Sequence, residues 1–305
     1  MTKKLLVTGL SGFVGTNLSK YISNQPNPSW SIIDTPEYDL NKPESLSTLF
    51  SDQTPDAVIH LAAQSFVPES FKDPKATINT NLIGTLNLLQ ALKTADFSGA
   101  FLYVSSGDVY GLVEESDLPI SESLQPQPRN PYAVSKVSAE LLCQQWSYSE
   151  PDWRIMIARP FNHIGPGQSD SFLVPEIAKQ LCLIKAGQQS PELQLGDIDV
   201  TRDFTDVRDV ISAYFTILES GKSGEIYNIC SGKERLVRDI ILTMCELAGV
   251  DATITQDETR LRKSQQRRAV GDYGKLASNT GWQPTIELEE SLRAILSDWE
   301  QRIHS

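Results

Sequence analysis

The sequence predicts an α/β protein with a doubly wound parallel sheet and a smaller, partly discontinuous C-terminal part. Apolar runs of strand length alternate with longer segments of helical period, which is the pattern of a parallel sheet covered by helices on both faces. The second half is less regular and contains stretches rich in glycine and proline. At 305 residues the chain also exceeds the usual size of one domain.

Each expected element follows from this alternation. The expected strands are Lys4–Thr8, Ser31–Asp34, Ala57–Leu61, Ala100–Ser105, Arg154–Ala158 and Glu225–Cys230. The expected helices are Phe13–Ser23, Pro43–Phe50, Pro74–Lys93, Pro131–Ser147, Val174–Ala186, Val207–Glu219, Val237–Ala248 and Leu288–Gln301. We expect one domain over 1–164, to which 206–232 returns, and a second over 165–205 and 233–305.

Composition narrows the classes of function. Hydrophobic residues at 40% and charged residues at 22% are ordinary for a globular protein, and no apolar run approaches the roughly 20 residues that span a bilayer. A net charge of −12 argues against affinity for nucleic acid or anionic lipid. The cysteines lack CxxC spacing and lie in apolar runs, so we expect reduced thiols, a cytoplasmic protein and no metal site. These cysteines are Cys143, Cys182, Cys230 and Cys245.

A glycine-rich segment, Gly9–Gly15, directly follows the first strand and opens a helix. Glycines at this place let the backbone approach a pyrophosphate, whose charge meets free N–H groups at the helix N-terminus. The pattern indicates a Rossmann-type dinucleotide site, although glycines after a strand can also simply form a turn. Asp34 ends the second strand, where a carboxylate can bind an adenosine ribose or can be a surface turn residue. The candidate contacts in the loop are Gly9, Ser11, Gly12, Phe13, Val14 and Gly15.

A second group of residues points to acid–base chemistry. Asn130 and Pro131 are typical of a helix start, and Tyr132 and Lys136 follow four residues apart on one face. An ammonium ~5 Å from a phenol favours the phenolate, so we expect Lys136 to lower the pKa of Tyr132 into the range useful for general acid–base catalysis. A chance Tyr/Lys pair on an amphipathic helix is the alternative. The strand-end serines Ser105 and Ser106 favour the catalytic interpretation.

Together, the glycine loop, the strand-end serine and the YxxxK helix resemble the extended short-chain dehydrogenase/reductases, the NAD-dependent epimerase/dehydratase family. The resemblance implies that Ser106 hydrogen-bonds a sugar oxygen, Tyr132 exchanges its proton, and Lys136 holds the ribose of an NAD(P) cofactor. His60, at the end of a strand, is interpreted as structural. The further cofactor contacts that the resemblance implies are Asp39, Leu40, Leu61, Ala62, Ala63, Gln64, Asn81 and Ser105.

The second half resembles the branch of this family that acts on GDP-sugars, nearest to the GDP-4-dehydro-6-deoxy-D-mannose reductases that form GDP-D-rhamnose. The matching segments are Arg159–Gln168, Arg202–Val210 and Tyr227–Gly232. An arginine fork suits a diphosphate, and an acidic protein needs such a local cation, although any one arginine can equally be a surface residue. His163 is interpreted as positioning rather than catalytic. The implied substrate contacts are Asn162, Arg202, Arg262 and Gln265.

Two departures from the family pattern bear on the substrate and the reaction. Gln265 stands where relatives carry an acidic residue that binds ribose, which leaves the nucleotide open. Dehydratases carry a glutamate just after the strand-end Ser or Thr, whereas the shorter Asp108, a further catalytic candidate, occupies that position here. We therefore expect NAD(P)H-dependent reduction of a 4-keto sugar, with 4-epimerase, 4,6-dehydratase or a catalytically silent dinucleotide sensor as alternatives. Product stereochemistry at C4 stays open.

Two further expectations concern the cofactor and the assembly. NADH is favoured over NADPH because no arginine or lysine follows Asp34 within 35–39 to receive a 2′-phosphate. The helices Pro74–Lys93 and Pro131–Ser147 carry more apolar positions than one core-facing stripe requires. By family resemblance, these helices pair with their copies in a homodimer.

Overall fold

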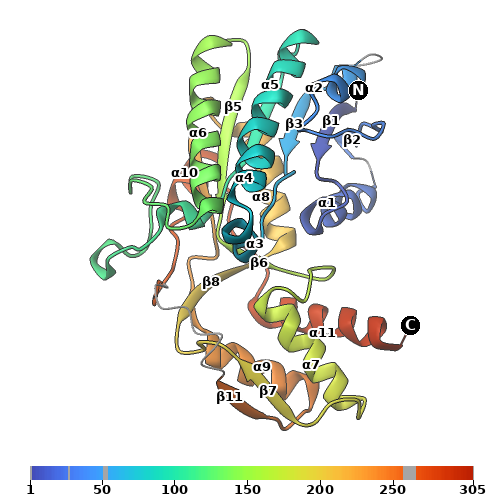
Figure 1. The fold of residues 1–305 in the computed structure, drawn as a ribbon, viewed down its shortest axis with the longest axis vertical. Coiled ribbons are helices and arrows are strands. Elements are labelled where there is room, and N and C mark those ends of the chain that lie inside the picture. Colours follow the sequence, from blue (N-terminus) through green and yellow to red (C-terminus); the bar gives the residue numbers. More distant parts are fainter. Residues whose placement is uncertain (1, 27, 51–53, 257–265, 305) are drawn as a thin grey trace.

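In the computed structural model, which describes residues 2–26, 28–50, 54–256 and 266–304, a six-stranded parallel sheet forms the centre of the larger part (Figure 1). Its strand order is β2-β1-β3-β4-β5-β9, and every neighbouring pair is parallel. The strands are β1 (Lys3–Thr8), β2 (Trp30–Ile32), β3 (Ala57–His60), β4 (Ala100–Val104), β5 (Arg154–Pro160) and β9 (Ile226–Ile229). All the expected strands are therefore confirmed, with ends that differ by a few residues.

Helices cover both faces of this sheet because successive strand residues point to opposite sides. Leu5 and Val7 pack in one apolar cluster, whereas Leu6 between them packs in another. The first cluster includes α1 (Phe13–Ser23), α8 (Val207–Ser220) and α10 (Gly274–Thr280). The second includes α5 (Gly84–Thr94) and α6 (Pro131–Ser149), which run side by side in Figure 1. The doubly wound fold is thus confirmed.

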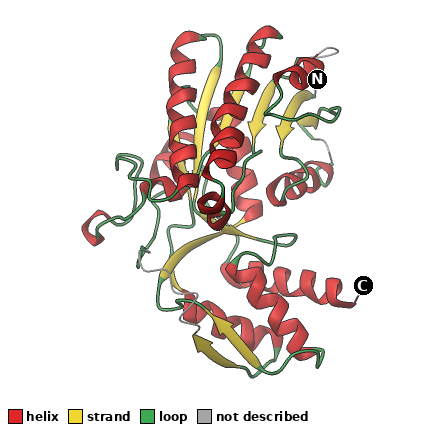
Figure 2. Cartoon of the chain, viewed as in Figure 1, coloured by secondary structure: helices red, strands yellow, loops and turns green. Residues whose placement is uncertain are grey.

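A smaller part lies beyond the carboxyl ends of the strands, at the bottom of Figure 2, and has its own core. Its helices α7 (Leu173–Lys185), α9 (Val237–Ala248) and α11 (Leu288–His304) pack around buried residues such as Ile177, Met244 and Ile295. Two small sheets accompany them, in the orders β10-β8-β6 and β11-β7. Their strands are β6 (Asn162–Ile164), β7 (Glu192–Leu195), β8 (Thr201–Asp206), β10 (Glu234–Leu236) and β11 (Thr253–Gln256).

Two expected helices are divided. The helix expected over Pro74–Lys93 comprises α4 (Pro74–Ile78), a π-helical turn η2 (Asn79–Ile83) and α5. The helix expected over Pro43–Phe50 is α2 (Pro43–Leu46) followed by the 3-10 turn η1 (Ser47–Phe50). Short π-helical turns inside helices are frequent at functional sites, and η2 places Asn81 in the interior.

Short elements account for most of what the sequence did not predict. Besides the five strands of the small sheets, these are α3 (Val67–Lys72), α10, η3 (Gly107–Tyr110) and η4 (Glu115–Asp117). Each is too short for a hydrophobic period to be visible in the sequence. The four cysteines are free, as expected. Among the described residues, no helix has the length and apolar character needed to cross a membrane.

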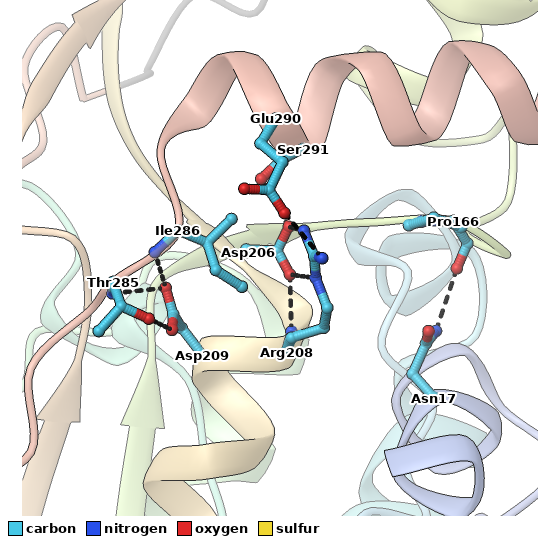
Figure 3. A network of polar contacts seen from close by, with 9 residues as sticks. All are labelled: Asn17, Pro166, Asp206, Arg208, Asp209, Thr285, Ile286, Glu290 and Ser291. Carbon is cyan, nitrogen blue, oxygen red and sulfur yellow. Dashed lines mark hydrogen bonds and ion pairs between the residues drawn. The ribbon is translucent and has the colours of Figure 1, made fainter. Parts of the chain in front are cut away.

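Buried carboxylates at the start of α8 join the two parts of the molecule (Figure 3). Asp206 accepts a hydrogen bond from Ser291 Oγ of α11 at 2.6 Å. Asp209 accepts the backbone N–H groups of Thr285 and Ile286 at 3.0 and 2.9 Å. These bonds satisfy polar groups that would otherwise be costly to bury, and they hold the segment 285–291 against the start of α8.

Candidate active site

The glycine loop joins β1 to α1 and leaves no room for a side chain at Gly9 or Gly15. Gly9 has φ +73°, and a Cβ there would lie 2.8 Å from the backbone nitrogen of Ala62. A Cβ on Gly15 would lie 2.5 Å from Gly9 O. The N-cap of α1 is Gly12, which makes no side-chain cap hydrogen bond, and the first turn contains no acidic residue. The N-terminus of α1 therefore suits the pyrophosphate of a dinucleotide.

The other residues expected at this loop surround it. Ser11 is exposed, whereas Phe13 and Val14 are half-buried against the core of the sheet. The backbone N–H of Ala62, in the loop after β3, donates to Thr8 Oγ1 at 3.2 Å. Its neighbours Leu61 and Ala63 are also half-buried. Since β1 and β3 are adjacent, the loops after them meet at one edge of the sheet.

Asn81 ties three segments together beneath this edge. Its Nδ2 donates to Gln64 O at 3.0 Å and to Ser135 Oγ of α6 at 2.9 Å, and its Oδ1 accepts the N–H of Gln64 at 2.8 Å. The Oε1 atom of Gln64 is buried and has no partner among the described residues. The π-helical turn η2 thus fixes the loop after β3 relative to the helix that carries Tyr132.

Tyr132, Ser106 and Lys136 converge at the carboxyl end of β4. Asn130 caps α6 by accepting the N–H of Ala133 at 2.7 Å. Tyr132, in the first turn, is buried and hydrogen-bonded to the side chain of Ser106. Lys136 donates from Nζ to Val104 O at 2.8 Å, and this nitrogen lies 5.9 Å from the centroid of the Tyr132 ring.

The expected pKa shift of Tyr132 is wrong in sign. Burial raises the pKa of Tyr132 to about 12, with Ser106 opposing this change through its hydrogen bond and the charge of Asp108 reinforcing it. Burial likewise lowers the pKa of Lys136 to about 8. Lys136 is engaged with a backbone carbonyl, so desolvation of the phenol dominates. Tyr132 is therefore protonated at neutral pH, which suits a proton donor.

Asp108 and Ser105 flank this group of residues. Asp108 is exposed, its Oδ2 accepts a hydrogen bond from Asn130 Nδ2 at 2.7 Å, and its N–H donates to Ser106 Oγ at 3.1 Å. Ser105 Oγ is buried and has no partner among the described residues. A buried hydroxyl normally finds a partner, so Ser105 fits a site that receives a polar group of a cofactor.

The end of β2 carries the residues expected to contact an adenosine. Asp34 is exposed, and Asp39 accepts the N–H of Asn41 at 2.9 Å. Leu40 is buried, and its carbonyl accepts Asn87 Nδ2 at 2.7 Å. Tyr38, which was not predicted from the sequence, is half-buried, and its hydroxyl hydrogen-bonds the backbone of Gly9. The one feature of the sequence that could have indicated Tyr38 is its position in the polar stretch after β2.

Residues of β6 and β8 face the other side of the site. Asn162 is exposed on β6, opposite Phe204 of β8. Arg202, on β8, donates from Nη1 to Thr201 O at 2.7 Å. Burial lowers the pKa of Arg202, whereas the charges of Asp197 and Asp108 act in the opposite direction, which places this arginine within electrostatic range of the catalytic group. Arg262 and Gln265 lie outside the described residues.

Both candidate histidines have structural partners. His60 is buried, with Nδ1 at 2.6 Å from Thr8 Oγ1 and Nε2 at 3.0 Å from Thr85 Oγ1, and burial lowers its pKa to about 3. His163 stacks on Phe13 with ring centroids 6.0 Å apart, and its Nδ1 lies 3.0 Å from a backbone carbonyl. Within the described part of the chain, no His, Cys, Asp and Glu side chains gather as a metal site would require.

Comparisons with known proteins agree with this architecture. A family model described as "GDP-mannose 4,6 dehydratase" matches residues 33–295. GDP-6-deoxy-D-mannose reductase of Pseudomonas aeruginosa is 54% identical over 304 residues, a match that covers 99% of each chain. GDP-6-deoxy-D-talose 4-dehydrogenase of Aggregatibacter actinomycetemcomitans is 33% identical and covers 97% of this chain and 96% of its own.

Solved structures are similar over the same length. RMD from Pseudomonas aeruginosa complexed with NADPH has a TM-score of 0.95 at 54% identity, with 99% of this chain and 100% of that chain covered. UDP-glucose 4-epimerase of Thermotoga maritima with UDP-glucose has a TM-score of 0.86 at 26% identity, with 98% and 99% covered. Since the family match and both of these likenesses span most of the chain, the protein belongs to the GDP-mannose 4,6-dehydratase family of extended short-chain dehydrogenase/reductases.

Proposed function

We propose that this protein uses a reduced nicotinamide cofactor to reduce the 4-keto group of GDP-4-keto-6-deoxymannose, which forms GDP-rhamnose. The observation that carries the proposal is the convergence of the Tyr132 phenol with Ser106 and Lys136 at the carboxyl end of β4, which places a proton donor where a ketone oxygen can bind. The relative of 54% identity is named GDP-6-deoxy-D-mannose reductase and covers the whole chain. The relative named for 6-deoxytalose is more distant, at 33% identity, which favours the rhamnose configuration.

The chain's own residues supply binding and proton transfer. When bound, the cofactor provides the hydride for the carbonyl carbon. Ser106 hydrogen-bonds the carbonyl oxygen, and the Tyr132 phenol donates its proton as negative charge develops on that oxygen. Lys136 holds the ribose next to the nicotinamide, and the N-terminus of α1 binds the pyrophosphate. The residues proposed to line the cofactor site are those identified from the sequence, together with Tyr38.

We assign substrate recognition to residues of β6 and β8, on the other side of the site from the glycine loop. Arg202 binds the diphosphate, because it is half-buried and its guanidinium has no ion pair within 4.0 Å among the described residues. Asn162 lies on the neighbouring strand β6 and contacts the same group. Arg262 and Gln265 are proposed to bind the nucleoside. We also propose a cofactor domain over 1–164 and 206–232 and a nucleotide-sugar domain over 165–205 and 233–305. Across this division, α10 of the second domain packs on the central sheet, and β6 at the end of 1–164 pairs with β8.

Product analysis tests the reaction directly. The protein is incubated with GDP-4-keto-6-deoxymannose and NADH or NADPH, and the product is identified by NMR. GDP-rhamnose is expected, whereas GDP-6-deoxytalose would mean that the sugar binds with its other face toward the cofactor. A 4-epimerase would instead interconvert two GDP-hexoses without net cofactor use, and a 4,6-dehydratase would convert GDP-mannose to the 4-keto sugar. Binding of cofactor without any turnover would favour a sensor.

We propose a homodimer from the surface of α6, and a cytoplasmic location from the four free cysteines. Val134, Leu141 and Tyr148 lie seven residues apart on one face of this helix and are 40%, 63% and 86% exposed. Ile78 of α4 and Ile83 of η2 are also exposed, and α4 and η2 contact α6. A contiguous apolar face of this kind indicates a protein interface, and pairing with its own copy makes the interface two-fold symmetric.

Replacing Leu141 with Glu is expected to convert a dimer to a monomer at micromolar concentration, as measured by light scattering, because a charge would be buried at the centre of the interface. Leu242→Glu is the matched control, since Leu242 is 47% exposed on α9, away from this face. A wild-type protein that is monomeric at the same concentration would refute the proposed assembly.

A further inference from the structure

Helix α6 carries three ionisable side chains at intervals of four residues. Tyr132 is followed by Lys136 and then by Glu140, and this spacing places the three on one face, each about one turn from the next. Lys136 is 4% exposed and Glu140 is 2% exposed. The row therefore leads from the reacting phenol into the interior of the protein, where a charge is costly unless another charge compensates it.

Arg159 of β5 fixes the inner end of this row. Its Nε and Nη2 donate to the two carboxylate oxygens of Glu140 at 2.9 and 2.6 Å, which is a bidentate pair. Arg159 is 2% exposed, and its guanidinium lies 4.8 Å from the ring centroid of Tyr110. The Tyr110 hydroxyl in turn donates to Asn228 Oδ1 at 2.7 Å. Glu140 is thus held in one orientation by a bidentate ion pair.

Resting on the proposed reductase function, we propose that Glu140, held by Arg159, is a positioning residue that keeps Lys136 charged one turn below Tyr132. Burial opposes the ammonium form of Lys136, and the Glu140 carboxylate is the largest influence in the other direction on the pKa of this lysine. The hydrogen bond from Lys136 to Val104 O orients the amine but supplies no negative charge. Buried ion pairs add little net stability, so we assign the Arg159–Glu140 pair the role of keeping Lys136 charged and not that of stabilising the fold.

The other titratable groups near Lys136 do not replace Glu140. His60 is neutral because its pKa lies at about 3, and burial raises the pKa of both the Cys143 thiol and the Tyr103 phenol, which are neutral too. Asp108 is exposed and acts on Tyr132. Within the described residues, the titratable or charged groups that interact with this row or belong to it are His60, Tyr103, Asp108, Tyr110, Tyr132, Glu140, Cys143, Arg159 and Tyr214, whose phenol burial keeps neutral.

The test is the pH dependence of turnover and of NADH binding. Lys136 acts in its protonated form, so activity is present below its pKa and is lost as the pH rises through it. In Glu140→Gln this pKa falls further, and the alkaline limb of both profiles is expected to move down by about one pH unit, with activity near wild type at low pH. Glu140→Asp keeps the charge, so its profiles are expected to lie between those of Glu140→Gln and the wild type.

A second variant separates this role from stability. Glu140→Gln leaves Arg159 buried without a counter-charge, whereas Glu140→Gln/Arg159→Met removes both charges and is expected to fold. The double variant should still show the downward shift, because Lys136 has lost its nearest carboxylate. Glu150→Gln at the end of α6 is the matched control, since ~20 Å of helix separates it from Lys136 and screening removes its influence.

The pH profiles of the variants decide whether Glu140 has the positioning role. If the double variant returns to the wild-type profile, or if Glu140→Gln changes stability alone, the positioning role is wrong. Titration of NADH binding by fluorescence needs no sugar, so it tests the inference by itself. A shifted binding profile without any GDP-rhamnose from the wild type would retain the inference and refute the proposed function. If the wild type forms GDP-rhamnose but Glu140→Gln shifts neither profile, the proposed function is retained and the positioning role is wrong.

Discussion

Tyr132→Phe is expected to lower kcat by about 10² to 10⁴ and to leave NADH affinity nearly unchanged. The substitution removes the hydroxyl that bonds Ser106 and donates the proton to the nascent alkoxide, while the buried ring that fills the start of α6 stays in place. The cofactor contacts of the glycine loop and of Lys136 are not altered. The loss should therefore appear in the hydride-transfer step, measured by stopped-flow absorbance of the nicotinamide in a single turnover.

Tyr227→Phe is the matched control for this experiment. Tyr227 is also buried, on β9, and its hydroxyl accepts a hydrogen bond from the backbone N–H of Lys222 at 3.0 Å. Removing that hydroxyl should leave turnover unchanged. Near-normal turnover of Tyr132→Phe would exclude Tyr132 as the acid, and equal losses in both variants would point to altered packing of the core.

The central sheet could be predicted because its strands are apolar on both sides. Leu5, Leu6 and Val7 are all buried, although they pack against different layers, so the apolar run is continuous and stands out from the helical segments. Strand β8 shows the opposite case. It contains the buried polar residues Asp203 and Thr205, and Asp203 accepts hydrogen bonds from backbone groups that are distant in sequence. Such burial depends on tertiary partners, which a local pattern does not contain.

The site shows the same division between local and tertiary information. The spacing of Tyr132 and Lys136 is a local property of one helix. They meet Ser106 because Ser106 follows the carboxyl end of β4, where Lys136 bonds Val104 O. The sign of the pKa shift is not local, because it depends on how completely the phenol is buried. The partnership of Glu140 with Arg159 likewise joins α6 to β5 and has no signature in either segment alone.

Steady-state kinetics should show a higher kcat/KM with NADH than with NADPH, by about tenfold or more. Asp34 follows β2, beside the glycine loop, and a carboxylate there accepts hydrogen bonds from ribose hydroxyls but repels a 2′-phosphate. No arginine or lysine lies within 35–39, and the next cation, Lys42, pairs with Asp39 at 3.6 Å. Since Asp34 is exposed, screening limits the effect to a preference. The relative of 54% identity was solved in complex with NADPH, the cofactor that this preference disfavours, so the kinetics are a direct test of the role of Asp34.

Asp34→Ala should chiefly improve the kcat/KM for NADPH and weaken NADH binding, because it removes the repulsion and the ribose contact together. Glu37→Ala is the matched control: it removes the same charge from the same exposed loop without altering the ribose contact, and so should change both cofactors alike. If the wild type has the higher kcat/KM with NADPH, then Asp34 does not contact the ribose as proposed. In that case Lys42, whose side chain is 65% exposed, becomes the candidate to bind the 2′-phosphate, and it is the first residue to substitute.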